Sequence, residues 1–272
     1  GEALPDLRLQ ALARFRQDLL SVAARQPHSG EWAQVFDPLT PVLQNFALPV
    51  NLLAQLLDAF EQDVRYTAAG QRYASDDALH DYCTRSANPV GRLLLHLYGI
   101  HDEVSLMQSD QICTALQLIN FWQDLSVDVA RHRWYPSVQA MQVFGVQDAD
   151  LQSDSTSPNA TKMIAAYADS ARDSMLKGAS LACRIPGRAG WELRLVVQGG
   201  LRILDKIEAL NYATWRTRPT LRGADGPLLP WRACAMQAHH RCLNWRPYPK
   251  PFMTPQDYVQ PTAATSARSV QS

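Results

Sequence analysis

Several absences narrow the classes of protein to which these 272 residues could belong. No apolar run reaches the roughly eighteen residues that a transmembrane helix needs, and no secretory signal is present. Basic and acidic residues both number 26, so there is no net charge and no electrostatic sign of nucleic-acid binding. We therefore expect a cytoplasmic protein that does not bind nucleic acid.

The cysteines give no disulfide framework. They are five in number and far apart, and at least three fall inside helical apolar patterns. Reduced and packed thiols are therefore expected. The spacing of His239, His240 and Cys242 matches no zinc-binding pattern.

The sequence also has almost no alternation of the kind found in strands, whereas helical periodicity is present along most of its length. It predicts an all-α, single-domain helical bundle with a central cavity, occupying residues 1–245. Residues 246–272 are rich in Pro, Thr, Ser and Gln and are expected to be disordered. About eight helices are expected, over residues 7–24, 31–45, 47–64, 75–98, 104–128, 161–183, 191–216 and 229–245.

Two of these helices contain residues that disturb or weaken a helix. Pro89 should kink the helix over 75–98, and the small residues around it, including Gly91, allow either close helix packing or a roomy cavity wall. Gly199 and Gly200 stand inside the helix over 191–216, where each glycine costs roughly 1 kcal/mol relative to alanine. Close packing or the close approach of a ligand is expected at these glycines.

The most informative segment places Asn120, Asp124 and Asp128 at successive four-residue steps. On an α-helix these steps put three oxygen-bearing side chains on one face. Hard divalent cations such as Mg²⁺ bind oxygen ligands and often share them with water and substrate phosphates. The segment is therefore interpreted as half of a metal–diphosphate site.

A solvated helix face is the alternative for this stripe. Residues 104–127 contain no Lys, Arg or Glu, which is unusual for a solvent-exposed face of that length. Large apolar side chains flank the polar line on both sides. Because buried carboxylates need a cation or hydrogen-bond donors, the stripe either lines a cavity that holds a cation or reaches water through a cleft.

Four segments together resemble the squalene/phytoene synthase family of head-to-head isoprenoid enzymes. The resemblance covers about residues 1–220, and within the family it is closest to the bacterial hydroxysqualene synthases of the hopanoid pathway. The segments are Gln117 to Asp128, which resembles the second aspartate-rich motif, Tyr82 to Gly91, Arg131 to Tyr135, and Gly199 to Glu208 followed by Asn211-Tyr212.

The resemblance implies a fold, a reaction and roles for particular residues. The fold is the isoprenoid-synthase helical bundle, and the reaction is Mg²⁺-assisted ionisation of presqualene diphosphate followed by water capture to give hydroxysqualene. The implied roles are Asn120, Asp124 and Asp128 as Mg²⁺ ligands, Gln117, Arg133 and Tyr135 in diphosphate binding, and Tyr82 and Tyr212 near the reacting carbons.

Other roles for some of these residues remain open. Arg133 could be a surface cation that exchanges roles with Arg131, and either tyrosine could be a packing residue whose hydroxyl is satisfied elsewhere. His132 departs from the family, since relatives often carry glycine at this position.

A larger departure concerns the first aspartate-rich motif, which has no equivalent in this sequence. We expect that the sequence, which begins with Gly1-Glu2, is truncated, with a lineage that has lost catalysis as the alternative. The functional alternatives are a presqualene-diphosphate or phytoene synthase, and a non-catalytic helical assembly partner derived from the family. Because substrate and product are very apolar, a weak peripheral contact with the inner membrane is also expected.

Overall fold

The computed structural model describes residues 4–152 and 156–242, and every regular element in them is a helix. This confirms the predicted all-α class, although the expected helices are divided at breaks into more segments. The predicted tail, residues 246–272, lies outside the described residues. The helices are α1 (Pro5–Ala23), α2 (Ala33–Asn45), α3 (Val50–Ala69), α4 (Asp76–Ser86), α5 (Asn88–Leu97), α6 (Glu103–Gln123), α7 (Leu125–Ala130), α8 (Val138–Phe144), α9 (Asp148–Gln152), α10 (Pro158–Gly178), α11 (Ser180–Arg184), α12 (Gly187–Ala209) and α13 (Asp225–Cys242).

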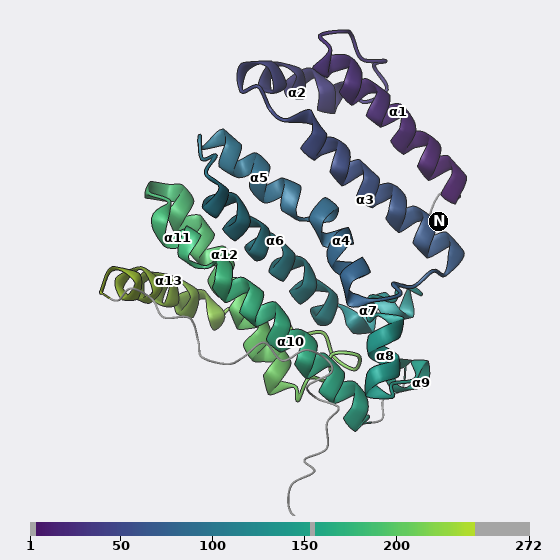
Figure 1. The fold of residues 1–272 in the computed structure, drawn as a ribbon, viewed down its shortest axis with the longest axis vertical. Helices are drawn as coiled ribbons and strands as arrows, with labels where there is room; N and C mark the ends of the chain where they lie inside the picture. The colour runs from purple at the N-terminus through teal and green to yellow at the C-terminus, as the bar shows by residue number, and fades with distance from the viewer. Residues whose placement is uncertain (1–3, 153–155, 243–272) are drawn as a thin grey trace, which may run out of the picture.

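Helix α6 forms the centre of the bundle. It packs against α4 and α5 on one side and against α10 and α12 on the other, as Figure 1 shows. Its apolar side chains form much of the main core and include Ile112, Ala115, Ile119 and Trp122, all at most 3% exposed. Helices α1, α2 and α3 enclose a second core around Phe36. A helix buried on several sides is apolar nearly all round, which explains the composition of α6.

The expected kink near Pro89 is a break between α4 and α5 at Ala87. Pro89 lies in the first turn of α5, where its missing N–H leaves no helical hydrogen bond unmade. A Cβ atom on Gly91 would lie 2.3 Å from Ser109 Oγ and 2.6 Å from Cys113 Sγ. The sequence allowed either close helix packing or a roomy cavity wall at Gly91. The structure shows close packing of α5 on α6 at this residue.

The adjacent glycines in α12 have different surroundings. A Cβ on Gly200 would lie 2.8 Å from Met175 Cε, whereas a Cβ on Gly199 would meet nothing within 4 Å. Gly200 therefore permits helix packing, and Gly199 has open space beside it. The position of Gly199 in the middle of a long helix makes it costly without a packing reason.

Gly199→Ala is therefore expected to raise the free energy of unfolding by about 0.5–1 kcal/mol, because alanine favours the helix more than glycine does. Gly200→Ala should stabilise less than Gly199→Ala, because Met175, Leu116 and Ile119 must shift to make room for the added methyl group. Urea unfolding of the two variants, followed by circular dichroism, measures both effects. A destabilised Gly199→Ala variant would contradict the open space described above.

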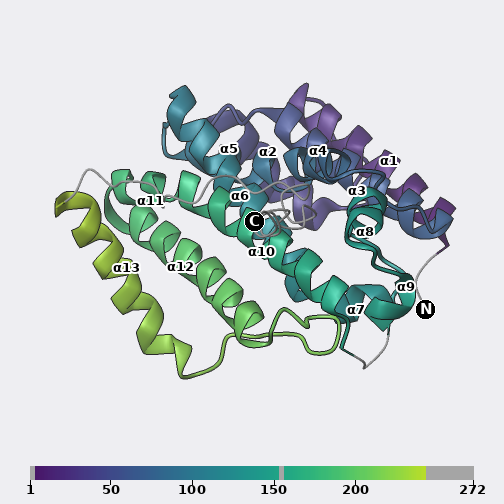
Figure 2. The ribbon, with the colours of Figure 1, turned by 60° about the horizontal axis from the view of Figure 1, so that its bottom comes forward.

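The connection between α12 and α13 passes close to the end of α6, as Figure 2 shows. Gln123 Nε2 donates a hydrogen bond of 2.7 Å to the carbonyl oxygen of Pro219 in this connection. At its far end Asp225 is ion-paired with Arg202 and Lys206 of α12. These contacts hold the connection over the α6–α7 junction. Among the described helices, none has the length and apolar character needed to cross a membrane.

Candidate functional site

The predicted acid stripe lies at the junction of α6 and α7. The expected continuous helix is interrupted at Asp124, which ends α6 and precedes α7. The backbone N–H of Asp124 still donates to the carbonyl of Asn120, and that of Asp128 to the carbonyl of Asp124, both at 2.9 Å. These hydrogen bonds preserve the four-residue steps, so the three side chains follow one another along one face.

Only the first of the three residues on this face is exposed. Asn120 is exposed, the Asp124 side chain is 20% exposed, and Asp128 is half-buried. Leu125, next to Asp124, is fully buried. The stripe is therefore neither a fully solvated face nor a sealed core position, and it begins at the surface and leads inward.

Arg218 in the α12–α13 connection is ion-paired with Asp124. Its Nε and Nη2 atoms lie 2.5 and 3.2 Å from the two carboxylate oxygens of Asp124. Asn120 donates a weaker hydrogen bond of 3.3 Å to the same carboxylate. The sequence analysis missed Arg218, because no local pattern relates it to an acid 94 residues earlier in the chain.

Asp128 is electrostatically the most unusual group of the stripe. Burial, together with the nearby charge of Asp124, raises the pKa of Asp128 to about 6. Arg133, Arg131 and Arg218 oppose this shift without cancelling it. A carboxylate in these surroundings is stabilised by any additional cation that approaches it.

Arg133 follows α7 through a tight turn. His132 adopts a left-handed conformation with φ of +58°, and Arg133 N–H donates to the carbonyl of Asp128 at 2.8 Å. A left-handed backbone conformation favours glycine, so this turn gives a physical reason to expect glycine at the position of His132. Arg131 is exposed, whereas Arg133 is half-buried and lines a cavity. Of these two cations, Arg133 is therefore the one directed into the protein.

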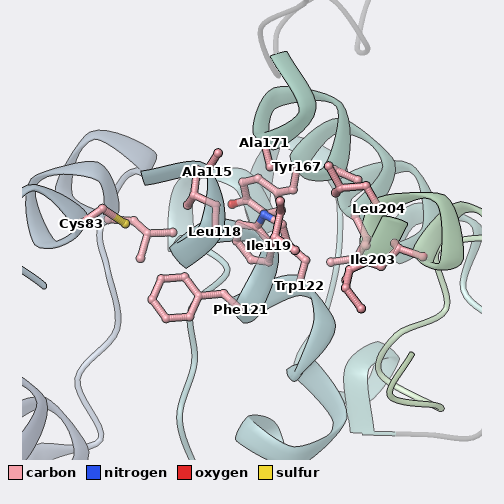
Figure 3. Close-up of a cluster of buried hydrophobic side chains, with 14 of the residues drawn as sticks. Cys83, Ala115, Leu118, Ile119, Phe121, Trp122, Tyr167, Ala171, Ile203 and Leu204 are labelled. Atoms are coloured by element: carbon pink, nitrogen blue, oxygen red, sulfur yellow. The ribbon is translucent and has the colours of Figure 1, made fainter. Parts of the chain in front are cut away.

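Tyr135 and Tyr82 belong to one aromatic cluster. Tyr135 stacks on Phe121 of α6 with ring centroids 3.7 Å apart and an angle of 15° between the rings. Tyr82 lies 6.2 Å from Phe121 and 5.8 Å from Tyr73 between ring centroids. Figure 3 shows Phe121 apart from the stacked pair of Trp122 and Tyr167. Phe121 is thus the aromatic residue of α6 that contacts the site tyrosines.

Asp63 of α3 is a second residue that the sequence analysis missed. Its Oδ2 accepts a hydrogen bond of 2.8 Å from the hydroxyl of Tyr82. Burial raises the pKa of Asp63, against the opposing effects of the Tyr82 hydrogen bond, Arg133 and Arg8. Only its place between Phe60 and Val64 on an otherwise apolar helix face could have singled it out in the sequence.

A cavity of about 400 Å³ lies against this group. Helices α1 and α3 and the turn at Arg133 form it, so Asp63 and Arg133 face the same space. Its lining consists of Arg8, Ala11, Leu12, Phe15, Trp32, Phe60, Asp63, Val64 and Arg133. A second cavity of about 420 Å³ lies away from the acid stripe, among α10, α11, α12 and α13.

The remaining predicted site residues are Gln117 on α6 and Tyr212 after α12. Gln117 is half-buried on α6, one turn before Asn120. Tyr212 follows the end of α12 in a left-handed conformation with φ of +61°. Burial raises the pKa of Tyr212, and its charged neighbours are Glu208, Asp169 and Arg172. Tyr82 has Asp63 as its charged neighbour instead, so the two tyrosines stand in different surroundings.

The donor set partly fits a magnesium ion. The described residues contain no group of three His, Cys, Asp or Glu side chains arranged to hold a metal. Asp124 and Asp128 nevertheless supply two carboxylates one helical turn apart, and Asn120 adds an amide. Mg²⁺ commonly takes one or two carboxylates and completes its shell with water and substrate phosphates. The residues therefore fit a cation that is shared with a phosphorylated ligand.

Comparison with known proteins finds relatives by sequence and by fold. A hydroxysqualene synthase of Sinorhizobium fredii is 28% identical over 207 residues, which are 76% of this chain and 66% of that protein. A phytoene synthase of Pseudescherichia vulneris is 25% identical over 213 residues, 77% of this chain and 65% of that protein. The crystal structure of squalene synthase HpnC from Alicyclobacillus acidocaldarius matches with a TM-score of 0.68 and 30% identity, covering 75% of this chain and 74% of that one.

The helical fold is that of the isoprenoid synthases. Within this class the chain belongs to the squalene/phytoene synthase family, whose model matches residues 1–225. The resemblance inferred from the four sequence segments is therefore confirmed. The matches span 31% to 66% of the length of the first three curated relatives.

Proposed function

We propose that the chain binds an isoprenoid diphosphate and promotes departure of its diphosphate, with presqualene diphosphate as substrate and hydroxysqualene as product. The single observation that carries the proposal is the placement of Asp128, Arg133 and Tyr135 around one turn, next to the aromatic cluster of Tyr82. Hydroxysqualene synthases among the relatives support the choice of substrate.

The proposal gives each side chain a role. Asp124 and Asp128, with Asn120, would hold Mg²⁺, which when bound supplies positive charge to the leaving diphosphate. Arg133 and Gln117 would bind diphosphate oxygens. Arg218, which neutralises Asp124 in this structure, is a further cation beside the same position. These cations lower the barrier because they stabilise negative charge as it develops on the leaving group.

The aromatic residues would serve the other half of the ionised substrate. Tyr82 and Phe121 are buried, and together with Tyr135 they form a ring cluster from which most water is excluded. The negative faces of aromatic rings stabilise a nearby positive charge. Tyr212 is proposed to lie near the substrate as well, from the side of α12. Because the substrate is apolar, a weak peripheral contact with a membrane is also proposed.

A second candidate function is synthesis of presqualene diphosphate or phytoene from two prenyl diphosphates. It is favoured by the phytoene synthase relatives, one of which matches as much of this chain as the hydroxysqualene synthases do. Both candidate functions begin with the same ionisation. They differ in what meets the carbocation, which is water in one reaction and a second prenyl chain in the other.

Product analysis distinguishes the two. A full-length version of the protein is incubated with Mg²⁺ and presqualene diphosphate, and in parallel with farnesyl or geranylgeranyl diphosphate. Extracts are analysed by gas chromatography and mass spectrometry. Hydroxysqualene formed from presqualene diphosphate without NADPH is the expected result. If a cyclopropyl diphosphate or phytoene is formed from the linear substrates, the second candidate function is correct and the first is wrong. No turnover of any substrate by the full-length version would favour a non-catalytic partner.

A further inference from the structure

The carboxylate of Asp63 lies between the 400 Å³ cavity and the tyrosine cluster. It lines that cavity together with Arg133, and it also borders a small space lined by Tyr73 and Tyr135. Tyr82, which is 3% exposed, donates its hydroxyl proton to Asp63 at 2.8 Å. Asp63 is therefore the acidic group that connects α3 with the proposed reaction site.

The hydrogen bond alone does not account for a charged side chain at this position. A neutral amide oxygen can also accept a phenol proton, although the hydrogen bond to a carboxylate is stronger. A half-buried carboxylate, by contrast, loses hydration and destabilises the fold in its ionised form. The negative charge of Asp63 therefore has a cost that the packing of Tyr82 does not require.

The charge has a definite effect on Tyr82. A phenol that donates its proton to a carboxylate keeps that proton, and burial together with Asp63 raises the pKa of Tyr82 far above its usual range. The hydrogen bond also fixes the rotation of the hydroxyl, so the lone pairs of its oxygen point away from Asp63. The adjacent carboxylate polarises this oxygen and makes it more negative. A fixed and electron-rich oxygen stabilises positive charge on a nearby carbon.

We infer that Asp63 is a positioning residue for Tyr82, which it holds as a proton donor so that the phenol oxygen faces the carbocation left by diphosphate departure. The inference rests on the proposed function. It gives α3 a part in the reaction, whereas the sequence had assigned the chemistry to α6, α7, the turn after α7, the Tyr82 helix and Tyr212. It also explains why a costly charge is retained beside a buried tyrosine.

Four variants test the inference. Asp63→Asn retains the hydrogen-bond acceptor and removes the charge, Tyr82→Phe removes the hydroxyl, and the double variant removes both. Asp58→Asn is the matched control, since Asp58 lies on the same helix and is paired with Arg16 outside the tyrosine cluster. The measurements are kcat and KM with presqualene diphosphate, and the thermal midpoint of each variant near neutral pH.

Asp63→Asn is expected to lower kcat by about tenfold or more with little change in KM, the size typical of residues that orient a functional group. In the Tyr82→Phe background the same change should have no further effect, because Asp63 acts through the missing hydroxyl. The thermal midpoint of Asp63→Asn should be unchanged or higher, because a destabilising charge has been removed. Asp58→Asn should leave kcat unchanged.

Several results would overturn the inference. If Asp63→Asn has a normal kcat, the inference about Asp63 is wrong, whereas the proposed function is unaffected. Independent losses that multiply in the double variant would show that Asp63 does not act through Tyr82. A lowered thermal midpoint with kcat restored at reduced temperature would assign Asp63 a structural role. These kinetic measurements use a full-length version of the protein. If that version is inactive toward both presqualene and farnesyl diphosphate, the proposed function is wrong, and so is the inference that rests on it.

Discussion

Asp128→Asn is expected to reduce turnover by roughly 10²–10³-fold, the usual loss when one preorganised electrostatic group is removed from an active site. Asparagine has the shape of aspartate and keeps one oxygen, but it removes the charge that would hold Mg²⁺. Asp124→Asn should have an effect of similar size. Product formation from presqualene diphosphate at saturating Mg²⁺ measures both.

Asp110→Asn is the matched control for these variants. Asp110 lies on α6, which precedes Asp124, but pairs with Arg92 of α5, away from the acid stripe. Its turnover should match that of the unmodified chain. Helix content, followed by circular dichroism, should be the same in all three variants. An Asp128→Asn variant with normal turnover would remove the metal assignment.

The raised pKa of Asp128 adds a dependence on pH. Below pH of about 6 Asp128 is protonated and cannot hold a cation, so turnover should fall as the pH drops through this value. The contribution of Asp128 to the free energy of unfolding changes with pH in the opposite direction to turnover. The folded state binds this proton more tightly than the unfolded state, so the contribution of Asp128 is fully present below the ordinary Asp value of 3.8 and is lost as pH rises through about 6.

Magnesium should therefore raise the thermal midpoint above this pH range, because it replaces the lost proton as a partner for the carboxylate. Asp128→Asn should respond less to Mg²⁺, and its thermal midpoint should be less sensitive to pH between about 4 and 6. The thermal midpoints of both proteins are measured in calcium-free buffer, once with Mg²⁺ and once with a chelator that removes it. An equal response to Mg²⁺ in both proteins would place the ion elsewhere.

The features predicted correctly from the sequence are local in the chain. The four-residue steps of Asn120, Asp124 and Asp128 depend only on helical geometry, and the backbone hydrogen bonds across the α6–α7 break retain them. The distinction between Arg133 and Arg131 required the structure, because it depends on how the left-handed turn at His132 directs the chain. Periodicity describes one element at a time and does not register such turns.

The missed residues are those whose partners lie elsewhere in the sequence. Arg218 meets Asp124 across 94 residues, and Asp63 meets Tyr82 from a different helix. Neither has a spacing pattern of its own, because its position is set by how helices and loops pack. For the same reason the sequence could not predict that Tyr212 would lie beside Arg172 of α10 rather than in the tyrosine cluster.

Trp122→Ala is expected to lower the free energy of unfolding by about 3–5 kcal/mol, the cost of removing a large buried aromatic side chain from a packed core. Trp122 is fully buried and stacks on Tyr167 with ring centroids 4.0 Å apart and an angle of 8°. It therefore joins α6 to α10 directly behind the acid stripe. Its indole N–H has no hydrogen-bond partner among the described residues.

Trp231→Ala is the control, since Trp231 of α13 is 67% exposed and its removal should change the free energy of unfolding by only about 0.5 kcal/mol. Trp122→Phe should cost less than Trp122→Ala, because phenylalanine keeps a ring against Tyr167 and buries no unpaired N–H. Urea unfolding measures all three variants. A loss below about 1 kcal/mol in Trp122→Ala would show that the α6–α10 interface does not support the site, because buried aromatic truncations cost more than this.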